Sequence, residues 1–166
     1  MEKPKILYHG SPKKLIGYKL LPKKAIDLGN KKENLHKAVY ATDFKNSAIA
    51  MAIICSKGVN GSSLNFEKKS KGVVYNGWPK QKIVYLHLLP KKAFKQTSKN
   101  SHQYFSEKSV KPIKTIKIKV KNNLNLIRKA TKKELFKYCK KYKLYYNKKD
   151  KTIYAKYKKN QIKNAR

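Results

Sequence analysis

The sequence has few acidic residues. Among 166 residues it contains 8 Asp and Glu against 43 Lys and Arg, which gives a formal net charge of +35. It also lacks long apolar runs, since the longest, residues 48–55, is far too short to cross a bilayer as a helix. The only two cysteines, Cys55 and Cys139, argue against a disulfide framework. We expect both to be reduced core thiols in apolar helices. With no signal peptide at Met1, we expect a cytoplasmic protein.

Metal and phosphate-loop motifs are missing as well. The four histidines, His9, His36, His87 and His102, have no metal-ligand spacing with each other or with the cysteines, so we predict no metal site. The glycines near residue 60 are not followed by the Lys-Ser/Thr pair of a nucleotide-binding loop. We predict that His87 is a satisfied strand residue and that Trp78 anchors a turn.

The positive charge is the strongest compositional signal. A field of this sign concentrates polyanions around a protein, and nucleic acid is the partner that we expect. The alternative is compositional drift toward lysine. The last 46 residues hold 17 basic and 2 acidic side chains, against 26 and 6 in the first 120. We therefore divide the chain into a domain of residues 1–120 and a basic extension of residues 121–166.

Apolar residues make up 40% of the chain, which is enough to form a packed core.

Short apolar segments separated by turn residues predict a mixed α+β fold. Residues 44–57 have apolar side chains at helical spacing, with Thr42 or Asp43 as the N-cap. Residues 13–37 and 59–71 are polar and Lys-rich, and we expect loops there, with short strands in the first. Strands are predicted at residues 6–8, 38–41, 73–75, 83–89, 104–110 and 113–120.

The basic extension has its own signals. Thr131-Lys-Lys-Glu134 is a capping box in front of an apolar run, which predicts a helix start. Residues 144–146 and 152–157 flank a turn sequence and predict a hairpin, with a frayed end from about residue 158. Six tyrosines alternate with lysines in this part of the chain. They favour either stacking platforms for single-stranded nucleic acid or plain packing of the helix and hairpin.

Three short segments occur in a specific order. Tyr8-His9-Gly10-Ser11 ends a strand, Val39-Tyr40-Ala41-Thr42 forms a second strand directly before an Ala-rich helix, and Gln103-Tyr104 opens a third. This order resembles the ADP-ribosyltransferase superfamily, in its histidine-tyrosine-glutamate branch with the poly-ADP-ribose polymerases and the rifampicin transferases. The resemblance covers about residues 5–120. It implies a split β-sheet core, followed here by a small basic helix-hairpin module.

The resemblance also implies roles for four residues with NAD as the substrate. His9 would hydrogen-bond a ribose hydroxyl, and the Gly10 backbone would bind the nicotinamide carboxamide, since glycine lets a ligand approach closely. Ser11 would add a ribose contact. Tyr40 would stack on the nicotinamide ring. Tyr8 and Tyr75 are further candidates for the walls of the site.

The catalytic acid of the family has no direct match. The family places a glutamate at the start of the third strand, where this chain has Gln103. Glutamine can hydrogen-bond a ribose hydroxyl but carries no negative charge. Glu107 is the alternative acid, although position 107 of an extended strand would lie about 13 Å from position 103. Gln103 and Glu107 both remain catalytic candidates.

The sequence thus predicts an NAD-dependent ADP-ribosyltransferase that acts on nucleic acid or on a protein associated with it. A non-catalytic nucleic-acid-binding protein with a vestigial NAD pocket is the alternative. An RNA-directed phosphate transferase is disfavoured, because the two arginines that could bind a phosphate, Arg128 and Arg166, both come late in the chain.

Overall fold

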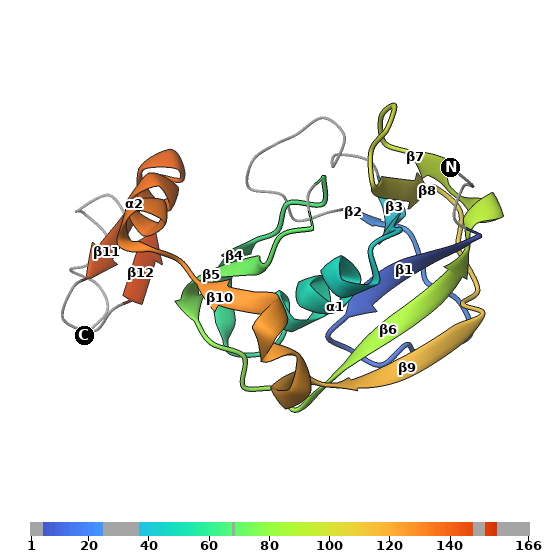
Figure 1. Cartoon of the computed structure of the whole chain (residues 1–166), viewed down its shortest axis with the longest axis horizontal. Helices are drawn as coiled ribbons and strands as arrows, with labels where there is room; N and C mark the ends of the chain where they lie inside the picture. The colour runs from blue at the N-terminus through green and yellow to red at the C-terminus, as the bar shows by residue number, and fades with distance from the viewer. Residues whose placement is uncertain (1–4, 25–36, 68, 148–151, 156–166) are drawn as a thin grey trace, which may run out of the picture.

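A computed structural model describes residues 5–24, 37–67, 69–147 and 152–155 (Figure 1). The predicted α+β class is confirmed: the described chain is mostly sheet, with helices on and beside it. The main sheet has the strand order β7-β8-β3-β1-β6-β9, with β2 paired to β3. Its strands are β1 (Ile6–Ser11), β2 (Lys23–Lys24), β3 (Lys37–Thr42), β6 (Ile83–Pro90), β7 (Lys95–Gln96), β8 (Gln103–Ser106) and β9 (Lys114–Lys119).

The centre of this sheet is built from its most apolar strands. β1 pairs antiparallel with β6 along its whole length, from Ile6↔Pro90 to Ser11↔Tyr85. β9 continues the sheet on the far side of β6. Its lysines are exposed and alternate with half-buried isoleucines, as expected for an edge strand with one wet face. The short 3-10 helix η2 (Lys91–Ala93) follows β6.

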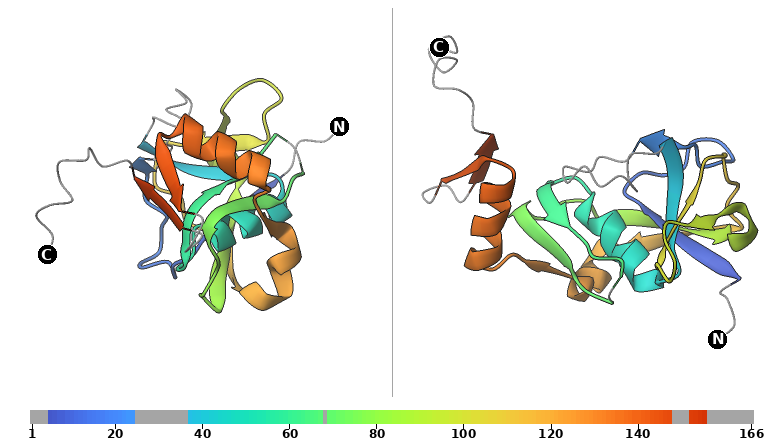
Figure 2. Two further views of the ribbon diagram at one scale, coloured as in Figure 1. Left: turned by 90° about the vertical axis from the view of Figure 1, so that its left-hand side faces the viewer. Right: turned by 90° about the horizontal axis from the view of Figure 1, so that it is seen from above.

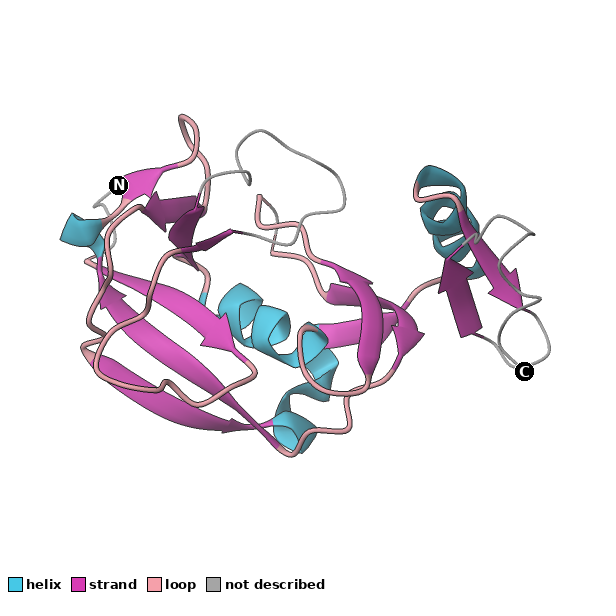
Figure 3. Cartoon of the chain, turned by 180° about the vertical axis from the view of Figure 1, so that it is seen from behind, coloured by secondary structure: helices cyan, strands magenta, loops and turns pink. Residues whose placement is uncertain are grey.

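Helix α1 (Lys45–Ile54) packs across one face of the main sheet (Figure 3). Seven of its ten residues are buried, because its alanines and isoleucines cover most of the helix surface. The predicted helix is confirmed, although it is shorter than residues 44–57. The backbone N–H of Phe44 donates to the Thr42 hydroxyl at 3.2 Å. The prediction of Thr42 or Asp43 as the N-cap was wrong: Phe44 is the N-cap, and no side chain accepts from the first helical amides.

Gly10 lets α1 approach β1 closely. A Cβ atom at Gly10 would lie 1.8 Å from the carbonyl oxygen of Ala48 and 3.0 Å from the amide nitrogen of Ala52. No side chain fits in that space. The face of the sheet away from α1 has a second core cluster, which includes Leu7, Leu89 and Tyr104.

A second, three-stranded sheet lies beyond α1 in the order β10-β5-β4, with β4 (Val59–Ser63), β5 (Gly72–Gly77) and β10 (Ile127–Lys129). The prediction of a loop over residues 59–71 was wrong for β4. The segment Val-Asn-Gly-Ser-Ser has little strand propensity and pairs with β5 through an irregular register, so tertiary pairing decides its conformation. The predicted strand 104–110 likewise ends at Ser106.

The 3-10 helix η3 (Val120–Leu126) leads from β9 to β10. Val120 and Ile127 are both buried in the core cluster beneath α1. The predicted domain boundary after residue 120 coincides with the start of η3 and stays a prediction.

The chain ends, within the described residues, in helix α2 (Lys132–Lys141) and a hairpin of β11 (Leu144–Asn147) and β12 (Thr152–Ala155). Both predicted elements are confirmed, including the capping box in which the Thr131 hydroxyl accepts from the Glu134 amide. Residues 156–157 of the predicted hairpin lie outside the described residues. Figure 2 shows that α2 and the hairpin stand together at one end of the molecule. The predicted fraying after residue 158 lies outside the described residues.

The two cysteines differ in burial. Both cysteines are free, as predicted. Cys139 is buried, but Cys55 is exposed at the end of α1, so the prediction of two core thiols was wrong for Cys55. No helix in the described part of the chain is long and apolar enough to span a membrane.

Candidate functional site

His9 occupies the centre of the main sheet, near the end of β1. Its Nδ1 lies 2.6 Å from the backbone carbonyl oxygen of Tyr40 on β3. A carbonyl can only accept, so Nδ1 carries the proton and Nε2 presents a lone pair. Burial lowers the pKa of His9, the bond to Tyr40 opposes that shift, and the charge of Lys23 adds to it. The ring is therefore a neutral hydrogen-bond acceptor at neutral pH.

The strands β1 and β3 are joined at a single residue pair, Tyr8↔Thr42. β1 and β6, in contrast, pair at six positions. The His9 ring bridges to β3 by reaching the Tyr40 carbonyl. The paired residues Tyr8 and Thr42 share one face of the sheet, and side chains alternate between faces along each strand. Tyr40, two residues before Thr42, lies on that face, whereas His9, next to Tyr8, lies on the opposite one. A ligand that touches both must lie across the place where the two strands part.

Tyr40 stands beside a second aromatic residue. It pairs across β3 and β8 with Phe105, and cross-strand partners share a face of the sheet. Both rings are half-buried. Burial raises the pKa of the Tyr40 phenol. Two aromatic side chains paired in this way place π-faces on one side of the sheet, the chemistry that a flat ligand requires.

The structure gives Gly10 and Ser11 local roles. Gly10 is required by the backbone of α1, as described above. The Ser11 hydroxyl donates to the Lys13 carbonyl at 2.9 Å and accepts from the Lys13 amide at 3.2 Å. It therefore holds the turn after β1. A ribose that bonded Ser11 would have to share the Ser11 hydroxyl with the Lys13 backbone.

The two predicted acid positions lie at opposite ends of β8. Gln103 begins the strand and pairs with Thr42, next to the pair that joins β1 and β3. Glu107 follows the last strand residue, Ser106, which pairs with Val39 at the other end. Glu107 is exposed. Of the two positions, only Gln103 is close in register to the His9 end of β1.

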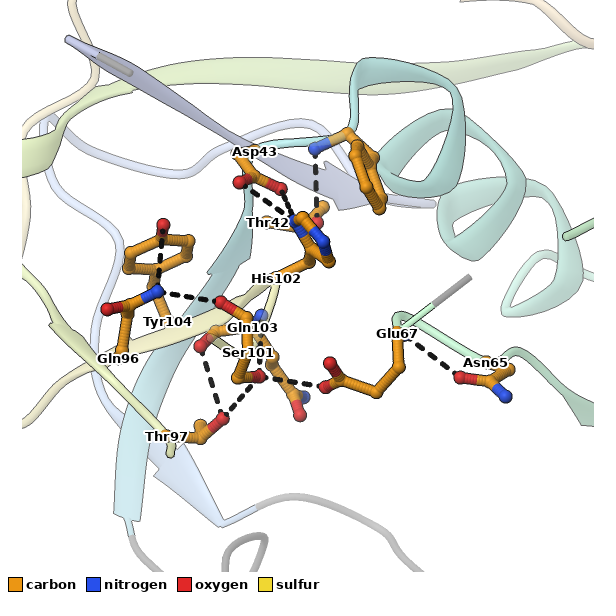
Figure 4. A network of polar contacts seen from close by, with 11 residues as sticks. Thr42, Asp43, Asn65, Glu67, Gln96, Thr97, Ser101, His102, Gln103 and Tyr104 are labelled. Carbon is orange, nitrogen blue, oxygen red and sulfur yellow. Dashed lines mark hydrogen bonds and ion pairs between the residues drawn. The ribbon is translucent and has the colours of Figure 1, made fainter. Parts of the chain in front are cut away.

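Two carboxylates near Gln103 were missed by sequence reasoning (Figure 4). Asp43 contacts His102 Nδ1 with both oxygens, at 3.0 and 3.1 Å. The His102 ring also stacks on Phe44, with the centroids 4.1 Å apart. Glu67 accepts from the Ser101 hydroxyl at 2.8 Å. Asp43 and His102 are 59 residues apart in sequence, and Glu67 and Ser101 are 34 apart, so no local motif links either pair.

His87 lies beside His9 on the neighbouring strand. The two residues pair in register, and their ring centroids are 5.9 Å apart. His87 is fully buried, and its Nδ1 bonds the Thr115 hydroxyl at 2.8 Å. Its Nε2 has no hydrogen-bond partner within the described structure, so the prediction of a satisfied residue was wrong for that atom. Burial, followed by the neighbouring His9, lowers the pKa of His87 to about 4.

Two other predicted aromatic residues lie away from His9. Tyr75 belongs to the second sheet, where its ring stacks on Tyr138. Trp78 packs against the core cluster beneath α1, as predicted for a turn anchor, and Lys129 Nζ lies 5.6 Å from its ring centroid. The described residues contain no group of three or more His, Cys, Asp or Glu that could hold a metal ion.

Comparisons of the chain with protein-family models, with curated proteins and with solved structures gave no match.

Proposed function

We propose that the protein is an NAD-dependent ADP-ribosyltransferase whose acceptor is nucleic acid or a protein bound to it. The observation that carries the proposal is the state of His9. Its Nδ1–H is fixed by the Tyr40 carbonyl, and its Nε2 is left as an acceptor where β1 and β3 part. A ribose hydroxyl is a matching donor. The aromatic pair of Tyr40 and Phe105 supports binding of the flat nicotinamide ring.

The reaction breaks the bond between the ribose C1′ and the nicotinamide nitrogen, which leaves with the electron pair. An oxygen or nitrogen of the acceptor then bonds to C1′ and releases its proton. Positive charge develops on the sugar, so negative potential nearby stabilises the transition state. Gln103 carries no negative charge. Asp43 is a carboxylate next in sequence to Thr42, the strand partner of Gln103, and its side chain is 16 % exposed. We include Asp43 with Gln103 and Glu107 among the residues to be tested.

NAD binding can be tested with a matched variant of His9. His9→Asn keeps a side-chain N–H for the Tyr40 carbonyl but removes the Nε2 acceptor. We expect it to remain folded and to bind NAD at least about fivefold more weakly by calorimetry, the contribution of one hydrogen bond. Absence of NAD binding by the folded wild type at millimolar concentration would overturn the site.

The acid can be assigned by nicotinamide release from three variants. If Gln103 occupies the acid position, Gln103→Glu raises turnover by up to about 100-fold, the effect of one preorganised electrostatic group. If Glu107 acts instead, Glu107→Gln abolishes release and Gln103→Glu changes little. Asp43→Asn gives the same test for Asp43, with far-ultraviolet circular dichroism as the folding control.

A non-catalytic nucleic-acid-binding protein is the second candidate function. The neutral Gln103 at the start of β8 favours it, as does the net charge of +35. A wild type that binds oligonucleotides but releases no nicotinamide, with no gain in Gln103→Glu, would select this function over the transferase.

A further inference from the structure

Phe136 is a large apolar residue that the fold leaves in solvent. It lies in the middle of α2, yet 72 % of it is exposed. The side of α2 that faces the protein is formed by other residues, of which Cys139 is buried and Tyr138 is half-buried. The capping box predicts where this helix starts, but it does not distinguish Phe136 from the apolar residues that pack.

Lysines surround Phe136 on the outer face of the helix. Residues three and four apart are neighbours on a helix surface, which places Lys132, Lys133 and Lys140 around the ring. All three are exposed. The acidic residue of α2, Glu134, accepts two bonds from Arg128, at 2.6 and 2.7 Å. Its charge is therefore matched within the protein, and the outer face is uniformly positive.

The tyrosines of this region are used for packing. The Tyr138 ring stacks on Tyr75 of β5, with centroids 4.0 Å apart and an interplanar angle of 12°. Tyr142 packs against the edge of Tyr138 at 4.8 Å. The stack on Tyr75 joins α2 to the second sheet, and Phe136 is left as the outward aromatic ring of the helix.

We propose that the outer face of α2, formed by Phe136, Lys132, Lys133 and Lys140, binds single-stranded nucleic acid. One base stacks on the Phe136 ring, and the adjacent phosphates contact the lysine ammonium groups. This inference rests on the nucleic-acid part of the proposed function and names its contact surface. A lipid surface fits less well, because insertion needs a broad apolar face and α2 turns that face toward the protein.

The test uses the full chain and a short oligothymidine that contains one 2-aminopurine, a base whose fluorescence is quenched by stacking. We expect binding to quench the probe, and Phe136→Ala to abolish the quenching and weaken binding at least about fivefold. Phe136→Trp should restore both. Replacing Lys132, Lys133 and Lys140 with Gln should lower the salt dependence of binding by about 2 in the log–log slope. No NAD is present, so failure of the transferase proposal leaves this result unaffected.

Tyr18→Ala is the matched control, because Tyr18 is an aromatic residue that is 85 % exposed outside α2. It should leave quenching and affinity unchanged. Equal losses in Tyr18→Ala and Phe136→Ala, or none in Phe136→Ala with folding intact, would overturn the proposal. So would Phe136-dependent binding to vesicles of mixed neutral and anionic phospholipid without quenching of the oligonucleotide.

Discussion

The two α-helices of the described chain have ten residues each and are held in opposite ways. Seven residues of α1 are buried and none of its side chains caps it. In α2 only Cys139 is buried, and the helix starts with a full capping box. A helix this short is marginal in water. Tertiary burial therefore stabilises α1, whereas local side-chain bonds and a few aromatic contacts stabilise α2.

The difference matters for function. α1 fixes the backbone next to His9, because it touches β1 at Gly10 without an intervening side chain. The His9 end of β1 is therefore closely packed against α1. α2 commits few side chains to the protein, so most of its surface remains available to a partner. Under the proposed function, the first region positions NAD and the second contacts nucleic acid.

Gly10→Ala should have the largest effect, since it breaks the contact on which α1 depends. The new Cβ would lie 1.8 Å from the Ala48 carbonyl oxygen, so α1 would have to move off the sheet. We expect a loss of about 3 kcal/mol or more in the free energy of unfolding, measured with urea. The control is Gly17→Ala, where φ is +81° and no atom lies within 4 Å of the new Cβ. It should cost about 1 kcal/mol. Equal effects would contradict close packing of α1 on β1.

Acid should lower the stability of the protein through His87, which pairs with His9 in the main sheet. Its pKa is about 4 in the folded protein, below the ordinary value of 6.5, so the unfolded chain takes up the proton first. The contribution of His87 is fully present above the unfolded value and is lost as the pH falls toward about 4. Between pH 7.5 and 4.5 this amounts to about 2.5 kcal/mol. His9, whose pKa is also lowered, acts in the same direction.

His87→Leu isolates this effect, because it removes the titrating ring from the buried strand. Urea unfolding at a series of pH values should give the variant a flatter acid limb than the wild type. Glu134 of α2 has a pKa of about 2 in the folded protein. Its protonation in the unfolded chain affects the wild type and the variant equally, so it cancels from the difference between their curves. Parallel curves for the wild type and the variant would mean that His87 is protonated as easily in the folded chain as in the unfolded one.

Local signals predicted much of the fold and little of the site. The apolar spacing of α1 and the Thr131 capping box each depend on neighbouring residues, so the sequence predicts them. β4 has no such pattern, because its conformation is imposed by pairing with β5. The order of His9 before Tyr40 indicated that the two belong together. The sequence could not predict that His9 Nδ1 meets the backbone carbonyl of Tyr40. The two residues are 31 positions apart, and their contact depends on how β1 and β3 are placed.

The sequence also did not predict which aromatic residues of α2 are exposed. Phe136 and Tyr138 are two residues apart in α2 and both are aromatic. Only the docking of α2 on Tyr75 decides that Tyr138 packs while Phe136 faces solvent. The pairing of Asp43 with His102 is set in the same way, by β8 lying beside β3.

Thr131→Ala should have the smallest effect and should be confined to α2. It removes the hydroxyl that accepts from the Glu134 amide at 3.3 Å, and loss of such a cap costs about 1 kcal/mol. Because α2 is held locally, we expect its amides to exchange with deuterium about fivefold faster while those of α1 remain unchanged as an internal reference. Thr131→Ser keeps the acceptor and should retain most of the protection. If the alanine variant leaves α2 exchange unaltered, tertiary contacts such as the stacking of Tyr138 on Tyr75, and not the cap, hold the helix. If α1 exchanges faster as well, the two helices unfold together and the contrast between them does not hold.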